Sequence, residues 1–294
     1  MNRGVLRWYF RSERLTNRAL AALRGCFDGL WLGVLSRAQL ARIDEVYYDN
    51  SREYVSESYN RGGLSSWEQA AVTNHFPKHG TVVVTSAGGG REVLALAAAG
   101  YRVIGFEPHP GLVKFGVGLL RADGLADAEL RPCEHDVWPA GVDRADAVVV
   151  GWGGYMLIPG HVRRVSFLRQ AALLLPAGAP VLLSFFTRQG DGVRLRMTVR
   201  LGNPLRRLLR REPVALGDAL VPNLVHLFTR SEVASELAEA GFELVDFGSE
   251  EYGWAVGRRV ADQREHIDQE REDRDRGSEP SAEATQGSCG VAAD

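Results

Sequence analysis

Short apolar runs alternate with segments of helical periodicity along most of this chain. Residues 1–76 predict helices; Ser36 and Gln39 match a capping box, and apolar residues follow them at helical spacing. From Thr81 onward, apolar runs separate the helical segments. The predicted strands are Val82–Thr85, Val103–Phe106, Glu129–Cys133, Ala147–Val150, Val181–Phe186, Phe242–Phe247 and Trp254–Arg258. Strands that alternate with helices predict an α/β fold whose parallel sheet is covered on both faces.

Breaks in this pattern divide the chain into three parts. Residues 1–76 form a predicted N-terminal helical cap, and residues 77–260 form the predicted α/β domain. Within that domain the alternation stops at about residues 187–228, which are rich in arginine and leucine and which we interpret as a lid insertion. Residues 261–294 are charged and lack aromatic side chains. We therefore expect them to form a disordered tail.

The segment Val82–Glu92, VVVTSAGGGRE, carries the strongest functional signal. A β-branched apolar run stops at three glycines, and helix-forming sequence follows, as in nucleotide-type sites. Glu107 ends the next predicted strand, where its carboxylate can accept hydrogen bonds from both hydroxyls of a ribose. Val93 occupies the position where a dinucleotide fingerprint needs glycine, and no Gly-Lys-Ser/Thr ends the loop. These features favour a phosphate-free nucleoside cofactor; a strand–turn–helix link without a ligand is the alternative.

On these residues the sequence resembles the class I S-adenosylmethionine-dependent methyltransferases. Their glycine loop commonly reads Asp-x-Gly-x-Gly-x-Gly and is often followed by Arg-Glu. Gly88 and Gly90 match the second and third glycines, whereas Ser86 replaces the first glycine and Val84 replaces the acid. The resemblance therefore rests on part of the motif.

The order of the later elements extends the resemblance to about residues 80–260. In the family, a helix ending in Ala-Gly-Phe precedes a final hairpin, and Ala240-Gly241-Phe242 stands in that place. The resemblance implies a Rossmann-like, seven-stranded, mostly parallel sheet with helices on both faces, preceded by a helical cap. It also implies methyl transfer from S-adenosyl-L-methionine.

The resemblance further implies where the cofactor binds. The loop amides would face its methionine part, Glu107 its ribose, Pro108 its adenine ring and Asp136 the adenine amino group, although Asp136 fits a loop or helix-capping acid equally well. The turn after the fourth strand would line the reactive end, because ligands lie at the carboxyl ends of parallel strands. The predicted cofactor residues are Ser86, Ala87, Gly88, Gly89, Gly90, Glu107, Pro108, Asp136, Val137, Gly151 and Trp152.

Methyl transfer from a sulfonium needs an aligned acceptor and a site without water, and it needs a base only if the acceptor arrives protonated. His226 is the candidate base, because similar sequences bring this region over the active site; a loop histidine remote from substrate is the alternative. We expect no metal, since the three cysteines lie far apart and no Cys-x-x-Cys spacing occurs. Candidate substrate-pocket residues are Tyr54, Trp67, Tyr155 and His161.

We expect a small-molecule acceptor, methylated at oxygen or nitrogen. The net charge of −2 argues against a basic surface for nucleic acid, and Gly151–Tyr155 lacks the Asn/Asp-Pro-Pro-Tyr motif of amino-group DNA methyltransferases. Two alternatives stay open. Ser86 and Val84 would suit a degenerate cofactor-binding protein without catalysis, and the arginines between residues 188 and 211 would suit an RNA or protein methyltransferase.

The N-terminus predicts a helix with one basic side. Its arginines recur every three or four residues, beside three aromatic residues: Arg3, Arg7, Arg11, Arg14, Arg18, Trp8, Tyr9 and Phe10. Such a helix is typical of peripheral contact with a membrane surface, but we favour packing on the domain through its apolar side. The apolar stretch Ala19–Leu35 is interrupted by charges, too short to span a bilayer and without a cleavage pattern. Three isolated cysteines favour a reducing, cytoplasmic setting.

Overall fold

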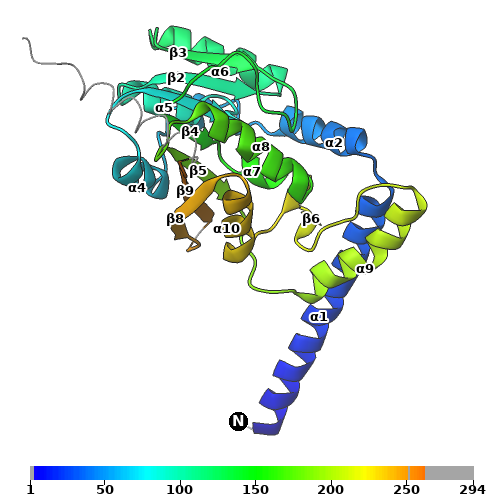
Figure 1. The fold of residues 1–294 in the computed structure, drawn as a ribbon. Helices are drawn as coiled ribbons and strands as arrows, with labels where there is room; N and C mark the ends of the chain where they lie inside the picture. Colours follow the sequence, from blue (N-terminus) through cyan, green and yellow to red (C-terminus); the bar gives the residue numbers. More distant parts are fainter. Residues whose placement is uncertain (1–2, 251, 262–294) are drawn as a thin grey trace, which may run out of the picture. The chain divides into compact units, whose positions relative to one another are not determined.

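The computed structural model describes residues 3–250 and 252–261, and Figure 1 shows their arrangement. The predicted tail 261–294 lies almost entirely outside the described residues. The elements are α1 (Arg3–Val34), α2 (Arg37–Asn50), α3 (Glu57–Asn60), α4 (Ser66–His75), β1 (Thr81–Thr85), α5 (Arg91–Ala98), β2 (Arg102–Glu107), α6 (Pro110–Ala122), β3 (Ala128–Pro132), β4 (Ala147–Val150), α7 (Gly154–Leu157), α8 (His161–Leu174), β5 (Pro180–Phe185), α9 (Val193–Leu208), β6 (Asp218–Leu220), β7 (Leu224–His226), α10 (Arg230–Glu239), β8 (Phe242–Gly248) and β9 (Gly253–Arg259).

A seven-stranded sheet forms the centre of the fold, in the order β3-β2-β1-β4-β5-β9-β8 (Figure 1). Strands β3, β2, β1, β4 and β5 pair in parallel, and β9 inserts antiparallel between β5 and β8. The predicted fold class is therefore confirmed. The seven predicted strands also lie within two residues of the observed ones, and most of them are apolar runs bounded by glycine, proline or charged residues.

The sheet separates two apolar cores, because successive side chains of a strand point to opposite faces. In β1, Val83 packs into the core beneath α8 and α10, whereas Val82 and Val84 pack into the core beneath α5 and α6. In β4 all four residues are buried, as expected for a central strand with helices on both sides. Helices thus cover both faces of the sheet.

The helices of the cap have two different surroundings. Helix α2 lies at the carboxyl end of the sheet, where Ser36 and Gln39 form the expected capping box. Helix α1 instead packs along α9, and Gly29 makes this possible, since a Cβ there would lie 2.6 Å from the carbonyl oxygen of Thr198. The favoured prediction for α1 is wrong: it packs through its glycine face, and its apolar side remains exposed.

Residues 187–228 leave the sheet and return to it at one point. Thr187 and Phe228 form a β-bridge, and between them lie α9 and the β6–β7 hairpin. Among the described residues, no single helix has both the length and the apolar composition needed to cross a membrane. Helices α1 and α2 meet these criteria only as a pair, with a bend of 119° between them.

Candidate functional site

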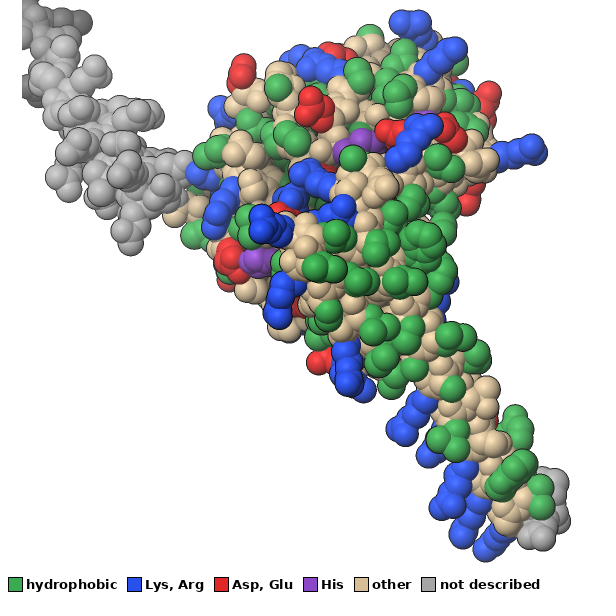
Figure 2. Space-filling model, turned by 90° about the vertical axis from the view of Figure 1, so that its right-hand side faces the viewer, with side chains coloured by type: hydrophobic (Ala, Val, Ile, Leu, Met, Phe, Trp, Pro, Cys, Tyr) green, Lys and Arg blue, Asp and Glu red, His purple; other side chains and the backbone are tan. Residues whose placement is uncertain are grey.

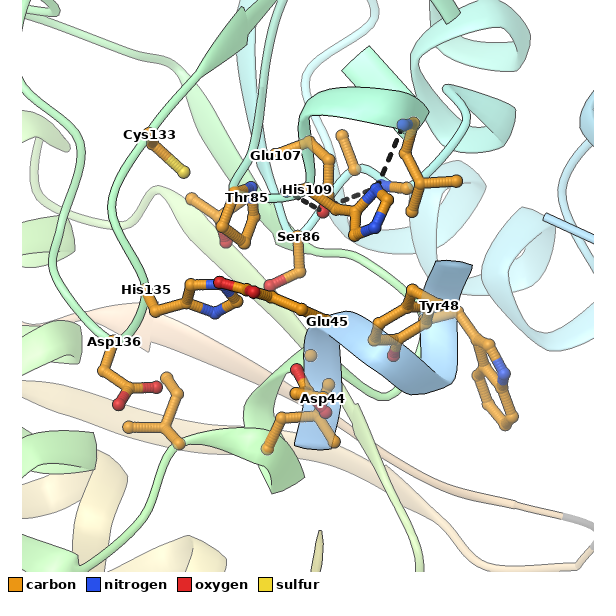
Figure 3. A pocket seen from close by; sticks show the side chains of 18 of the residues that line it. Asp44, Glu45, Tyr48, Thr85, Ser86, Glu107, His109, Cys133, His135 and Asp136 are labelled. Atoms are coloured by element: carbon orange, nitrogen blue, oxygen red, sulfur yellow. Dashed lines mark hydrogen bonds between the residues drawn. The ribbon is translucent and has the colours of Figure 1, made fainter. Parts of the chain in front are cut away.

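A pocket lies at the carboxyl ends of β1, β2 and β4, beneath α2 (Figure 3). The empty space that it bounds, open solvent at its mouth included, is about 1250 Å³. Its lining comes from the glycine loop, from the residues that follow β2 and β3, and from α2. Its position agrees with the rule that open parallel sheets bind ligands at this edge.

The glycine loop forms the floor of this pocket. Gly89 packs against the carbonyl group of Tyr54, and a Cβ at Gly89 would also lie 2.6 Å from Oδ1 of Asn60. Gly90, the N-cap of α5, has a φ of 98°, a conformation that favours glycine. Glycines here thus let a segment of the cap close directly onto the loop.

Backbone strain is concentrated at the pocket. Three non-glycine residues among those described have positive φ: Ser86 (50°), Asp136 (58°) and Arg210 (54°). The first two line the pocket. Such conformations cost free energy and persist mainly where the surrounding structure imposes them, which is common at binding sites.

Glu107 lies at the end of β2 with both carboxyl oxygens held. The backbone N–H groups of Gly88 and His109 each donate to it at 2.8 Å. Burial raises the pKa of Glu107 to about 7, and the nearby carboxylates of Asp44 and Glu92 act in the same direction, while the two N–H donors oppose them. The result is a fixed carboxyl group that faces the pocket and changes charge near neutral pH.

The Arg-Glu pair after the glycines ties three elements together. Arg91 donates to both oxygens of Glu68 on α4, at 2.6 and 2.7 Å, and to Glu92 at 2.7 Å. Glu92 also accepts the N–H of Trp152 at 3.0 Å, in the turn after β4. Burial raises the pKa of Glu92, and the charge of Arg91 opposes this. This buried network fixes the loop, the cap and the turn relative to one another.

Helix α2 supplies an acidic wall that the sequence analysis missed. Asp44, Glu45 and Tyr48 project from it into the pocket (Figure 3). Burial raises the pKa of Asp44, although Asn223 of the β6–β7 turn donates a hydrogen bond to it. Acids on an amphipathic helix usually face water, so only the spacing of Asp44 and Tyr48, one helical turn apart, hints at a shared face.

Two histidines from other elements also line the pocket. His135 lines the pocket after β3, and His109 lines it at the start of α6. The Nε2 atom of His109 lies 3.1 Å from Asp49, and its Nδ1 atom accepts the N–H of Leu112 at 3.3 Å. Both histidines follow the end of a strand in the sequence, and this position is the signal from which they could have been predicted.

Most of the predicted cofactor residues meet in the pocket. Two of the set, Gly90 and Gly151, do not line it; Gly151 instead lies against the carbonyl of Ser86 and donates its N–H to Thr85 at 2.7 Å. Asp136 forms an ion pair with Arg37 at 3.1 Å. The predicted residues that line the pocket are Ser86, Ala87, Gly88, Gly89, Glu107, Pro108, Asp136, Val137, Trp152 and Tyr54.

Three predicted substrate residues lie elsewhere. Trp67 stacks on Trp254 with 6.1 Å between ring centroids. Tyr155 and His161 both bind Glu236, which is buried beneath the sheet and held by Arg164 at 2.6 Å. None of the three lines the pocket. The structure thus brings these three side chains together with other partners and not with the residues that line the pocket.

His226 does not reach the pocket either. Its Nδ1 atom lies 2.7 Å from Asp218, the residue opposite it in the β6–β7 hairpin, and its ring packs edge-on against Phe228. Its side chain is almost fully buried. The hairpin does reach the pocket, but through Leu224, which lines it, and through Asn223.

Two buried atoms in the pocket wall lack a hydrogen-bond partner among the described residues: Oδ1 of Asn60 and Oγ1 of Thr85. Buried polar atoms are normally paired. The carboxyl of Glu107 and the glycine loop both line the pocket and offer polar groups to a nucleoside. No group of three or more His, Cys, Asp or Glu side chains in the described ranges is arranged to hold a metal ion.

Comparison with solved structures gives methyltransferases at 18% sequence identity. The methyltransferase CcbJ from Streptomyces caelestis has a TM-score of 0.56, and the match covers 74% of this chain and 100% of that one. The 1,6-didemethyltoxoflavin-N1-methyltransferase from Burkholderia thailandensis, solved with S-adenosylhomocysteine, has a TM-score of 0.55, with coverages of 76% and 89%. A methyltransferase from Methanosarcina mazei has a TM-score of 0.52, with coverages of 68% and 100%.

No protein-family model and no curated protein matches the chain. At such low identity, likeness to solved structures concerns the fold. The strand order, the antiparallel β9 and the structural neighbours agree with one another. The chain therefore has the fold of the class I S-adenosylmethionine-dependent methyltransferases.

Proposed function

We propose that this protein is an S-adenosylmethionine-dependent methyltransferase that acts on an oxygen or nitrogen atom of a small molecule. The position of Glu107 carries the proposal. Its carboxyl ends β2, faces the pocket beside the glycine loop and is fixed by two backbone N–H groups. When bound, S-adenosylmethionine supplies both the methyl group and the leaving thioether, so the protein's task is to bind, align and exclude water.

The described residues divide this task among them. We infer that Glu107 binds the ribose, that Pro108 and Val137 flank the adenine, and that Asp136 accepts from the adenine amino group. We infer that the glycine loop, whose residues line the pocket, holds the methionine tail.

The acidic wall of α2, together with Glu134 after β3, supports a neutral or cationic acceptor. Asp44, Glu45 and Glu134 line the pocket beside Tyr48, and an anionic acceptor would be repelled there. Burial raises the pKa of Asp44, which makes its carboxylate a stronger base than that of an exposed aspartate. We infer that Asp44, rather than His226, accepts the proton of an acceptor that arrives protonated.

Ligand-dependent melting tests the cofactor assignment. S-adenosylmethionine and S-adenosylhomocysteine should both raise the melting temperature at concentrations well above their dissociation constants, and NAD should not. Glu107→Ala should weaken binding by about 1–3 kcal/mol, the scale for hydrogen bonds to a charged group. Glu243→Ala, on the distant strand β8, is the matched control. A stronger effect of NAD, or equal affinities in the two variants, would contradict the assignment.

Turnover tests the chemistry separately from binding. Purified protein should convert S-adenosylmethionine to S-adenosylhomocysteine when cell metabolites are supplied, and Asp44→Asn should lower the rate by about 10²–10⁴-fold if it removes a base. Tight cofactor binding without turnover for any acceptor fraction would instead favour the degenerate binding protein. Salt-sensitive binding of RNA would favour the RNA methyltransferase.

A further inference from the structure

One side of α1 is apolar and exposed along the whole helix. Trp8 is 72% exposed near its start and Leu23 is 68% exposed in its second half. A helix of a globular protein normally turns such a stripe toward the core. The other exposed large apolar residues of α1 are Val5, Leu6, Tyr9, Phe10, Leu15, Leu20, Phe27, Leu30, Trp31 and Val34.

The contact with α9 fixes this orientation. Gly25, Gly29 and Gly33, spaced four residues apart, form the α1 face against α9. Thr198 donates to the carbonyl of Gly25 at 3.3 Å, and Arg206 donates to the carbonyl of Leu32 at 2.6 Å. Because the glycine face is held in this way, α1 cannot rotate to bury its apolar side against α9.

The exposed side belongs to a strongly basic part of the chain. Residues 3–34 and 193–211 together contain thirteen arginines and two acids, whereas the whole chain has a net charge of −2. In the first half of α1 the arginines recur every three or four residues, so they share one side of the helix. In Figure 2 these basic side chains follow one side of the helix, and hydrophobic side chains follow the other.

We propose that α1 lies in the surface of a membrane that contains anionic lipids. Its apolar side would enter the boundary between headgroups and acyl chains, and its arginines would stay at headgroup level. Tryptophan and tyrosine, both present on the exposed side, favour this boundary because their rings are apolar and their tips polar.

The charges favour a membrane over a second copy of the chain. Helices that pair through apolar stripes usually carry charges of both signs beside the stripe, so that opposite charges meet across the pair. The basic half of α1 has Glu13 as its only acid. Two copies would therefore face one another with like charges, whereas anionic headgroups supply the opposite sign.

Co-sedimentation of the full chain with vesicles tests this proposal. The protein should bind phosphatidylcholine vesicles that contain phosphatidylserine, and bind pure phosphatidylcholine vesicles much less. Replacing Trp8 and Leu23 together by Ser should weaken the binding on the order of 100-fold, because two large side chains no longer enter the lipid. The matched control replaces Val162 and Leu173, which are 78% and 75% exposed on α8, by Ser.

A second pair of variants tests the charge. Arg7→Gln with Arg11→Gln should weaken binding roughly 10- to 30-fold, since each arginine near an anionic surface contributes about fivefold. The matched control is Arg102→Gln with Arg121→Gln, at two arginines exposed on the sheet domain. This control should leave vesicle binding unchanged. Circular dichroism confirms that every variant is folded. Three results would overturn the proposal. The protein could bind both vesicle types equally, or the α1 variants could bind as well as their controls. The protein could also form a dimer in solution that only the Trp8 and Leu23 variant dissociates.

Discussion

Glu107 is a buried acid whose charge changes close to neutral pH, because burial raises its pKa from 4.5 to about 7. Between these two values the folded protein holds a proton that the unfolded chain has released. The free energy of unfolding therefore falls as the pH rises through this window. The stabilising contribution is complete below the unfolded pKa, is lost as the pH passes about 7, and amounts to roughly 3 kcal/mol.

The variant Glu107→Gln isolates this effect, since glutamine keeps the shape and never ionises. The wild type should lose up to roughly 3 kcal/mol of stability relative to this variant between about pH 5 and about pH 8. Denaturant unfolding of both proteins across this range measures the difference, in which the other titrating groups largely cancel. A constant difference would show that the carboxyl is already ionised at low pH.

Single residues could be predicted where the strand pattern positions them, and not where a distant partner does. Glu107 and the glycine loop end adjacent parallel strands, so spacing alone brings them together. Asp44 accepts a hydrogen bond from Asn223, which lies 179 positions away in the sequence. The sequence of α2 alone does not indicate this contact. His226 has the chemistry of a base, but Asp218 and Phe228 hold its ring outside the pocket.

At the scale of elements, the close contact of α1 and α9 depends on glycine. A Cβ at Gly29 would lie 2.6 Å from the carbonyl oxygen of Thr198 and 3.1 Å from Cβ of Leu201, so the helices would have to move apart. Gly29→Ala should lower the free energy of unfolding by about 1–3 kcal/mol, the usual cost of overpacking.

The matched control for this contact is Gly118→Ala in α6, where a Cβ would meet no atom within 4 Å. Alanine is the better helix former, so the control should stabilise by about 0.5–1 kcal/mol. Denaturant unfolding compares the two variants. If both stabilise the protein, α1 does not pack against α9 in solution as described.

Strands and helices could be predicted as elements because the pattern of apolar and polar residues within each one indicates it. The face through which a helix packs could not be predicted in this way. In α1 the apolar stripe is the strongest local pattern, and it favours packing through that side. The observed contact uses glycines, whose role becomes visible only once Arg194, Thr198 and Leu205 of α9 lie against them.

At the scale of the whole molecule, one buried ion pair joins three helices beneath the sheet. Glu236 of α10 accepts hydrogen bonds from Arg164 of α8 and from Tyr155 of α7. Glu236→Gln leaves the guanidinium of Arg164 without its charge partner, which should destabilise the fold by about 3–5 kcal/mol. Exposed Glu243→Gln should change stability by less than about 0.5 kcal/mol. Thermal and denaturant unfolding measure the loss of stability in the two variants. Similar losses would mean that water reaches the ion pair between Arg164 and Glu236.

The pairing of α1 with α9 also orders events during synthesis. Roughly 160 residues separate the two helices in sequence. At a synthesis rate of about 5–20 residues per second, α1 has left the ribosome for roughly 10–30 s before its partner exists. Throughout that interval its glycine face and its apolar face are both uncovered. The glycine face of α1 is therefore covered only after synthesis has reached α9.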